Sequence, residues 1–175
     1  MKKTNLFFLV TLLIGLNSYA QKSEVKIFVT LSPAGDFVAK TADVKGFAIL
    51  NSKDGSYTAD NVIIEAKSLK TGLSLRDEHM QNKYLEVSKF PQIILKKAKG
   101  VNNKGVGILV IKGKEIKVSG TYKATEKSIV AEFSMNLKDA GIEDVSYKGV
   151  GVDDEIKIVA ELPIQKSESK ASAKK

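Results

Sequence analysis

Hydrophobic and polar residues alternate along most of the chain beyond residue 20. In segments 25–31, 116–122, 129–137 and 156–164, every second residue is apolar or Gly, and the residues between them are mostly polar. Successive side chains of a β-strand point to opposite faces, so a period of two indicates strands that bury one face. The pattern predicts a protein built mainly from half-buried strands.

Short connectors separate these segments. Segments 33–36, 102–105 and 112–114 contain the Pro, Gly, Asn or Asp residues that are typical of tight turns. Connectors of this length join antiparallel neighbours, and about eight such strands form a sandwich or a barrel. Outward positions are polar, whereas a membrane-spanning barrel has an apolar outer face. We therefore predict an all-β fold, an antiparallel up-and-down barrel of about eight strands that does not span a membrane.

One segment follows a helical period instead. Ser74 stands at the position of an N-cap, Asp77 and Glu78 occupy the first turn, and one face repeats every three or four residues. This face consists of Leu73, Arg76, Met80, Tyr84 and Val87. Polar caps and early acidic residues are typical of a helix start because they satisfy free amide groups there. We predict one short helix over residues 75–86, which lies between two strands as a lid or a buttress.

The first twenty residues have the pattern of a secretory signal. Two lysines precede an apolar run at 6–16, and small residues at positions 18 and 20 predict cleavage before Gln21. The run is shorter than the roughly 20 residues of a membrane-spanning helix, and an uncleaved N-terminal anchor is the alternative. The sequence has no Cys, which excludes a lipid-anchored lipoprotein. We expect segment 1–20 to direct export, to the periplasm or to the medium.

The rest of the chain divides near residue 165. Segment 21–165 has the length of one domain, and we assign it to the barrel. Without Cys this domain has no disulfides, so its stability must come from an apolar core. Segment 166–175 has no apolar residue larger than Ala, which is typical of a disordered basic tail. Its lysines suit either contact with a membrane surface or a simple solubilising role.

The chain is basic, with a formal net charge of +8. Its lysines are spread along the whole sequence, and Arg76 is the only arginine. Nucleic-acid sites usually concentrate arginine together with exposed aromatic residues. We therefore expect a lysine-rich, solvated surface and no nucleic-acid partner.

Arg76 and the only histidine, His79, lie three residues apart on the predicted helix. Residues at this spacing share a helix face. The planar fork of an arginine suits a carboxylate or a phosphate, so the pair is a candidate polar clamp for a ligand head group. The alternative is a structural role, in which Arg76 bonds to nearby backbone carbonyls or acidic side chains.

The sequence offers little for catalysis or metal binding. One His and no Cys are too few for a typical zinc site, and no GxSxG nucleophile motif is present. The acidic run at 153–155 lacks the alternating spacing of a calcium loop. We predict a protein that is not an enzyme and that holds no metal and no resident cofactor.

The inward face of the predicted barrel is almost wholly apolar, with Tyr122 as a polar tip. A closed barrel of about eight strands either fills with side chains or leaves room for one small ligand. Small residues at positions 66, 107, 120, 131 and 160 would leave volume unfilled if all of them face inward. A plain packed core is the alternative, and periodicity does not separate the two.

Segment 68–94 resembles the YceI-like family. The resemblance is carried by Arg-Asp-Glu-His-Met at 76–80, Tyr-Leu at 84–85 and Pro-Gln-Ile at 91–93. Further matches bring it to nearly all of residues 22–165. The chain departs from the family pattern at Lys138, where Arg is usual, and at Leu95, where Phe is frequent.

The resemblance implies a lipocalin-like barrel that binds a polyisoprenoid such as a quinone or a polyprenyl lipid. An exported protein of this kind would carry, store or sequester its ligand, as a monomer or a homodimer. Such a cavity would be lined by apolar residues and Tyr122, with Arg76 and His79 near a polar end. The candidate ligand-binding residues are Ile27, Phe47, Val62, Ile64, Arg76, His79, Leu95, Ile111, Tyr122, Phe133, Met135 and Ile158.

Two other functions are weighed against this one. The first is a non-enzymatic interaction module with a filled core, whose lysine-rich surface binds an acidic partner. The second is an enzyme that acts on a bound lipid with His79 as general base. The lipid-binding barrel, which the resemblance implies, ranks first, the interaction module second and the enzyme third.

Overall fold

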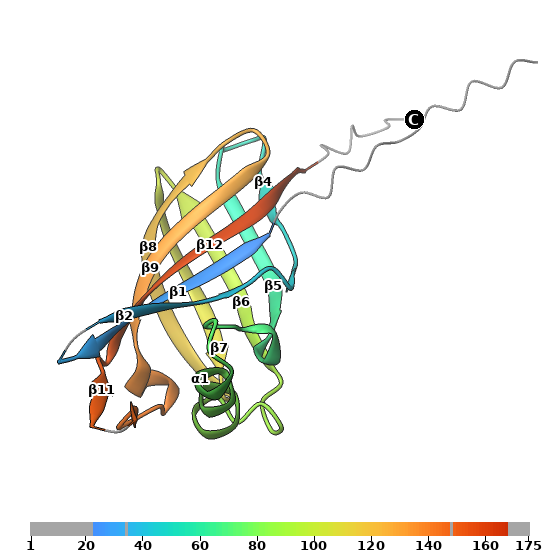
Figure 1. Cartoon of the computed structure of the whole chain (residues 1–175). Coiled ribbons are helices and arrows are strands. Elements are labelled where there is room, and N and C mark those ends of the chain that lie inside the picture. The colour runs from blue at the N-terminus through green and yellow to red at the C-terminus, as the bar shows by residue number, and fades with distance from the viewer. Residues whose placement is uncertain (1–22, 34, 148, 168–175) are drawn as a thin grey trace, which may run out of the picture.

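The computed structural model describes residues 23–33, 35–147 and 149–167 (Figure 1). The predicted signal segment 1–20 and the predicted tail beyond Ser167 lie outside these residues. The strands are β1 (Glu24–Ser32), β2 (Asp36–Thr41), β3 (Val44–Lys45), β4 (Ala48–Leu50), β5 (Tyr57–Glu65), β6 (Gln92–Val101), β7 (Lys104–Ile111), β8 (Lys114–Ala124), β9 (Ser128–Asn136), β10 (Ser146–Tyr147), β11 (Val150–Val152) and β12 (Glu155–Lys166). The helical segments are η1 (Ala66–Ser68), α1 (Ser74–His79), the π-helical η2 (Met80–Tyr84) and η3 (Leu137–Ala140).

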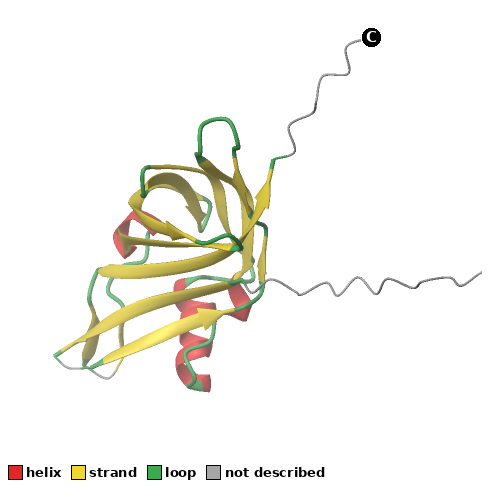
Figure 2. Ribbon diagram, turned by 90° about the horizontal axis from the view of Figure 1, so that it is seen from above, coloured by secondary structure: helices red, strands yellow, loops and turns green. Residues whose placement is uncertain are grey.

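Seven strands close into a barrel. Each strand from β5 to β8 runs antiparallel to the next, and β9 runs antiparallel to β12. β12 pairs with β4, and β4 pairs with β5, which completes the circle. Figure 2 shows the strands curving around a common interior. The predicted all-β barrel is confirmed.

The closing contact of the barrel is parallel, whereas the sequence predicted antiparallel neighbours throughout. Ile164 of β12 pairs with Ala48 of β4, and both strands run in the same direction. β12 is 12 residues long, and the edge that holds β4 near its end holds β1 along residues 157–161. β2 then pairs with β1. These two additional strands extend the wall at the end of the barrel that carries α1 and β11 (Figure 1).

The strands bury one face, as their period of two predicts. In β8 the buried residues are Ile116, Val118 and Tyr122, and they alternate with exposed positions such as Lys117 and Lys123. In β12, Ile156 and Ile158 are buried on either side of the exposed Lys157. Burying an Ile or Leu side chain contributes about 1.5–3 kcal/mol, so repeated alternation is sufficient to fix which face points inward.

The helical segment begins at Ser74 and continues from α1 into η2, so the predicted helix at 75–86 is found in nearly the expected place. The predicted N-cap is wrong: the capping position is Leu73, and no side chain caps it. Asp77 instead reaches back to Thr71, whose backbone amide and hydroxyl each donate a 2.7 Å hydrogen bond to its carboxylate. A carboxylate is a stronger acceptor than a hydroxyl, which explains why the acidic residue holds the turn before the helix.

Candidate ligand-binding site

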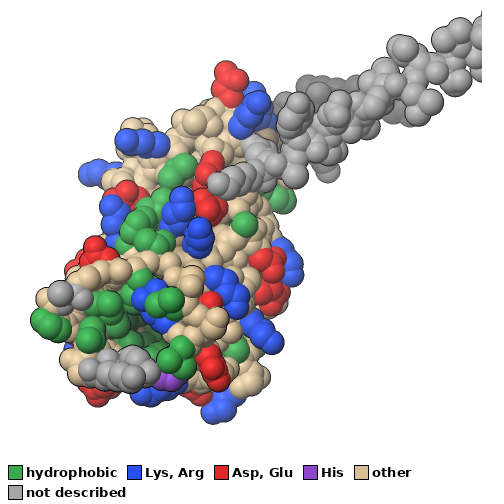
Figure 3. All heavy atoms as spheres, in the orientation of Figure 1, with side chains coloured by type: hydrophobic (Ala, Val, Ile, Leu, Met, Phe, Trp, Pro, Cys, Tyr) green, Lys and Arg blue, Asp and Glu red, His purple; other side chains and the backbone are tan. Residues whose placement is uncertain are grey.

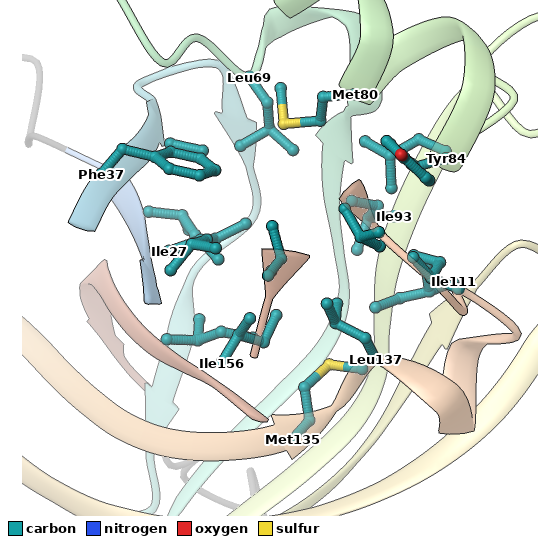
Figure 4. A pocket seen from close by; sticks show the side chains of 18 of the residues that line it. Ile27, Phe37, Leu69, Met80, Tyr84, Ile93, Ile111, Met135, Leu137 and Ile156 are labelled. Carbon is teal, nitrogen blue, oxygen red and sulfur yellow. The ribbon is translucent and has the colours of Figure 1, made fainter. Parts of the chain in front are cut away.

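A cavity of about 650 Å³ lies inside the barrel, toward the end that carries α1. Its wall is formed by inward-facing strand residues and by the helical segment α1–η2. Figure 4 shows apolar side chains from these elements pointing into one space: Ile27, Phe37, Leu69, Met80, Ile93, Ile111, Met135, Leu137 and Ile156, together with the ring of Tyr84.

The alternation of the strands produces this apolar wall. β12 contributes four residues of one parity, at 156, 158, 160 and 162, and β1 contributes residues 25, 27, 29 and 31. The two strands are neighbours, with Ile27 paired to Ile158, so the two sets lie side by side. The wall therefore follows from the sequence pattern alone, whereas the empty space follows from how far apart the facing walls stand.

Several residues at the opening of the cavity line its wall and are also exposed to solvent. Leu73 and Leu75, at the start of α1, line the cavity and remain 58% and 53% exposed. The segment from Ile142 to Val152 borders the opposite side through Val145, Ser146 and Val150. Figure 3 shows hydrophobic side chains gathered around a hollow at this end of the molecule. We call this opening the mouth.

Arg76 supplies a cation to the wall near the mouth. Its guanidinium carbon lies 4.1 Å from the centre of the Phe37 ring, and its Nη2 donates a 3.1 Å hydrogen bond to the carbonyl of Thr71. Its Nε is buried and has no hydrogen-bond partner among the described residues. His79 lines the same cavity. An unsatisfied buried donor is costly, which makes Arg76 the polar group of the wall that lacks a full set of partners among the described residues.

Asp77 fixes the position of Arg76 by anchoring the start of the helix. Burial by itself would raise the pKa of the Asp77 carboxyl. The side-chain and backbone hydrogen bonds from Thr71, followed by the charges of Lys70 and Arg76, outweigh burial and hold the pKa below its ordinary value. The residue is only 8% exposed, so this ionised anchor belongs to the structure beneath the mouth.

The part of the chain that the structure describes can be compared with the requirements of a metal site and of a membrane-spanning helix. Among the described residues, no group of three or more His, Asp and Glu side chains stands close enough to hold a metal ion. None of the helices formed by residues 23–33, 35–147 and 149–167 is both long and apolar enough to cross a membrane.

The model of the YceI-like domain family matches residues 19–164. The chain belongs to the YceI-like family. Solved structures with the same fold include BcnA from Burkholderia cenocepacia, with 16% identity and a TM-score of 0.63 over 82% of this chain and 96% of that one. Another is a polyisoprenoid binding domain from Saccharophagus degradans, with 10% identity and a TM-score of 0.57 over 80% of this chain and 91% of that one. No curated protein matches the chain.

Ten of the twelve predicted site residues border the cavity of this YceI-like barrel. Arg76 and His79 come from the helical segment, and the other eight come from strands. They are Ile27, Val62, Ile64, Arg76, His79, Leu95, Ile111, Phe133, Met135 and Ile158. The structure therefore brings together residues that are spread over more than 130 positions of the sequence.

Phe47 is not among the residues that line the cavity, and it is 38% exposed. It follows Gly46, whose φ of +136° breaks the strand between β3 and β4 and changes which residues face inward. A β-carbon at Gly46 would lie 3.0 Å from the Cα of Val62, so no other residue fits there without displacement. Ala48 takes the inward position instead. The segment 44–50 is apolar on both parities, so the pattern did not identify this change.

Tyr122 lies at the other end of the YceI-like barrel, beside a second space of about 100 Å³. Its ring meets Tyr57 edge-on, with centroids 5.4 Å apart, and occupies the volume where a side chain at Gly100 would be. Gly107, Gly120 and Ala131, which were expected to leave volume unfilled, line this smaller space and not the main cavity. Only Ala160 among the predicted small residues borders the main cavity. The two tyrosines close this end of the barrel core.

Sequence reasoning missed several cavity residues. Ile93 and Ile156 have the same parity as Leu95 and Ile158, and applying the period of two consistently would have found them. The same holds for Val25, Val29, Leu31, Leu109 and Leu162 on β1, β7 and β12. A further group comes from helical segments, from their neighbourhood or from the short strand β2, where no clear period of two exists: Phe37, Leu69, Met80, Tyr84, Leu137 and Ile142.

Proposed function

We propose that the chain is an exported protein that holds an isoprenoid or a similarly long apolar ligand inside its barrel, for carriage, storage or sequestration. The observation that carries the proposal is the cavity of about 650 Å³ with an almost wholly apolar wall. Its volume lies within the range of about 300–1,000 Å³ that is usual for ligand pockets. The polyisoprenoid binding domain from Saccharophagus degradans has the same fold, which supports the proposed ligand class.

The wall favours a hydrocarbon because it offers few polar partners. Removing apolar surface from water contributes about 25 cal/mol per Å², so a long chain that fills the cavity binds mainly by desolvation. Leu69, Ile93 and Ile156 show the character of this wall: each is less than 10% exposed and each lines the cavity. A ligand with several charged groups along its length would lose hydration there without compensation.

Arg76 and His79 supply a polar end for such a ligand. Both line the cavity close to the mouth, and the buried Nε–H of Arg76 is without an acceptor among the described residues. A carbonyl, carboxylate or phosphate head group would satisfy this donor. We propose that the hydrocarbon lies in the cavity and that its head group faces Arg76.

The alternative of an interaction module with a filled core is less well supported, because the barrel interior has a large apolar space. Binding is also better supported than catalysis on a bound lipid, since the side chains around His79 in the wall are predominantly apolar. Export remains part of the proposal and rests on the signal pattern of residues 1–20.

The test is native mass spectrometry of the protein purified without detergent from an exporting host, followed by extraction and identification of bound lipid. The wild type is expected to carry a discrete added mass that extracts as a prenyl lipid. Ala160→Phe fills space inside the cavity and is expected to lower the ligand-bearing fraction about tenfold, equivalent to about 1.4 kcal/mol. Its neighbour Val159 lies outside the cavity lining, so Val159→Phe is the matched control.

Two outcomes would contradict the proposal. One is a wild-type protein that carries no lipid and takes up none when quinones and polyprenyl phosphates are offered. The other is a bound lipid that the Ala160 variant keeps to the same extent as the wild type and the Val159 variant, because binding would then lie outside the cavity.

A further inference from the structure

We propose that the α1 side of the mouth docks on a membrane surface that contains anionic lipid, and that the ligand enters and leaves there. The inference rests on the proposed function, because it concerns the route of an apolar ligand into the cavity. It adds a partner and a contact surface, which we call the rim and define as Leu73, Leu75, Lys40, Lys70 and Lys83.

The rim presents apolar side chains to solvent at the cavity mouth. Among the large hydrophobic residues that the described part of the chain exposes, Leu73 and Leu75 line the main cavity, whereas Phe28, Phe47, Val101 and Val106 do not. About half of the surface of each of these leucines is in contact with water, although both line the cavity. Contact with a lipid surface would remove the exposed half from water and continue the apolar wall into the hydrocarbon.

Exposed lysines lie on the segments next to α1. Lys70 forms a β-bridge with Lys40 through two backbone hydrogen bonds of 2.9 Å, which places the two exposed lysines side by side. Lys83 extends from η2, with its Nζ 5.0 Å from the centre of the Tyr84 ring. Basic residues next to an anionic membrane are attracted to it, and the attraction weakens as salt is added.

The acidic residues on the same elements offset only part of this charge. The Asp77 carboxylate is buried, accepts two hydrogen bonds from Thr71 and lies 4.0 Å from the Nζ of Lys70. The exposed acids of these elements are Asp36 of β2 and Glu78 of α1, which the three lysines of the rim outnumber. Across the mouth, Glu143 and Asp144 are exposed beside the cavity-lining Val145. This asymmetry selects the α1 side, rather than the whole mouth, as the side that faces anionic lipid.

A lipid surface accounts for both the exposed leucines and the lysines of the rim. The proposed ligand is insoluble in water and is stored in membranes, so a mouth pressed against a bilayer spares the hydrocarbon a passage through water. A combination of apolar insertion and basic contacts is the usual requirement for reversible binding at a membrane surface.

The test is sedimentation of the protein with vesicles of phosphatidylcholine alone and of phosphatidylcholine mixed with phosphatidylglycerol. The wild type is expected to bind the anionic vesicles at least about tenfold more tightly than the neutral ones, with the difference decreasing as salt is added. The double variant Leu73→Ser, Leu75→Ser is expected to lose most of the binding. Both side chains are more than half exposed, so the fold is expected to remain, which circular dichroism checks.

The matched control is the double variant Val101→Ser, Val106→Ser. These valines are 45% and 63% exposed and lie on β6 and β7 around the hairpin at the opposite end of the barrel. The control is expected to bind anionic vesicles like the wild type. Equal loss in both double variants, or none in the leucine variant, would overturn the proposal, as would a wild type that binds neither kind of vesicle or that binds only a protein partner.

Binding of farnesol without vesicles separates this inference from the proposed function. If the wild type binds farnesol, and vesicle binding is lost in the leucine variant but kept in the valine control, the rim is a docking surface of a lipid-binding protein. If the wild type binds farnesol and no vesicle, docking is refuted and the lipid-binding function stands. If the wild type binds vesicles and the leucine variant does not, but the wild type binds no prenyl compound, the rim is confirmed and the proposed ligand is wrong.

Discussion

The hydroxyl of Tyr84 is both donor and acceptor to a single residue, Ser146. It donates a 3.1 Å hydrogen bond to the carbonyl of Ser146 and accepts one of 3.2 Å from the amide of the same residue. Tyr84 belongs to η2 and Ser146 to β10, which lie 62 residues apart in the sequence. Since both residues line the cavity, this pair ties the helical side of the mouth to the opposite side.

Tyr84→Phe removes both hydrogen bonds and keeps the ring. Because the pair is solvent-accessible, we expect a loss of only about 0.5–1.5 kcal/mol in the free energy of unfolding. The local effect should be larger: amide hydrogen exchange at Ser146 becomes faster, while exchange in β8 does not change. An unchanged exchange rate at Ser146 would show that the hydroxyl does not hold the two sides together.

Asp77 makes a pH-dependent contribution to the stability of the fold, through the turn that precedes α1. Its folded-state pKa is depressed, chiefly because the hydrogen bonds from Thr71 outweigh the effect of burial. A depressed carboxyl pKa stabilises the fold fully above the unfolded-state value of about 3.9, and this contribution is lost as pH falls through the folded-state value.

Asp77→Asn should therefore destabilise the protein by about 1–2 kcal/mol near neutral pH and by less at about pH 3. Urea unfolding at the two pH values measures the difference between wild type and variant. Glu78→Gln, at an exposed neighbour on α1, is the control and should change stability little at either pH. A difference that stays constant with pH would mean that the charge of Asp77 contributes nothing.

Arg76 has a separate, ligand-dependent role. Arg76→Met keeps much of the side-chain volume and removes the stacking on Phe37, which should cost about 0.5–2 kcal/mol of stability. We also expect the wild type to bind farnesyl phosphate more tightly than an equally long hydrocarbon, by about tenfold or more. The Met variant should lose this preference, whereas Arg76→Lys should keep part of it through its charge. Titration calorimetry with both ligands measures the preference, and a preference that persists in the Met variant would exclude Arg76 as the head-group partner.

How much the sequence predicted can be judged from particular residues. Ile158, Phe133 and Met135 were assigned to the inner wall because their strands alternate cleanly, and the fold keeps that parity. Phe47 was misassigned because Gly46 changes the facing of the strand, and a left-handed glycine inside an apolar segment leaves no periodic trace.

The presence of a cavity could not be predicted from the hydrophobic periodicity of the sequence. Whether an inward face is packed or hollow depends on the distance between walls that are far apart in sequence, and on which small residues face a neighbouring ring. Tyr122 fills the space beside Gly100 at one end of the barrel, whereas toward the other end the inward-facing side chains leave the main cavity open. The mouth likewise depends on the arrangement of α1 and β10, which the helical period of segment 75–86 did not contain.

Gly120 marks the point where β8 begins to pair with β9. It pairs with Gly105 on β7 and with Phe133 on β9, so backbone approaches it from both sides. A β-carbon at this position would overlap the carbonyl oxygen of Glu132 and stand 2.7 Å from the Cβ of Phe133. To relieve this overlap the backbone of β9 must shift, because the overlapping atoms do not belong to the end of a flexible side chain. Gly120→Ala should therefore destabilise the barrel by about 1–3 kcal/mol.

The paired residue Gly105 is the matched control. A β-carbon there would have its nearest neighbours at 3.7 Å and 3.9 Å, which are ordinary contacts. Gly105→Ala should leave stability unchanged or raise it slightly, since Gly weakens the interior of a strand. Urea unfolding of the two variants gives the comparison. Equal effects on the free energy of unfolding would mean that β8 and β9 can separate at Gly120 without cost. The close approach of these two strands would then not determine the shape of the barrel beside Tyr122.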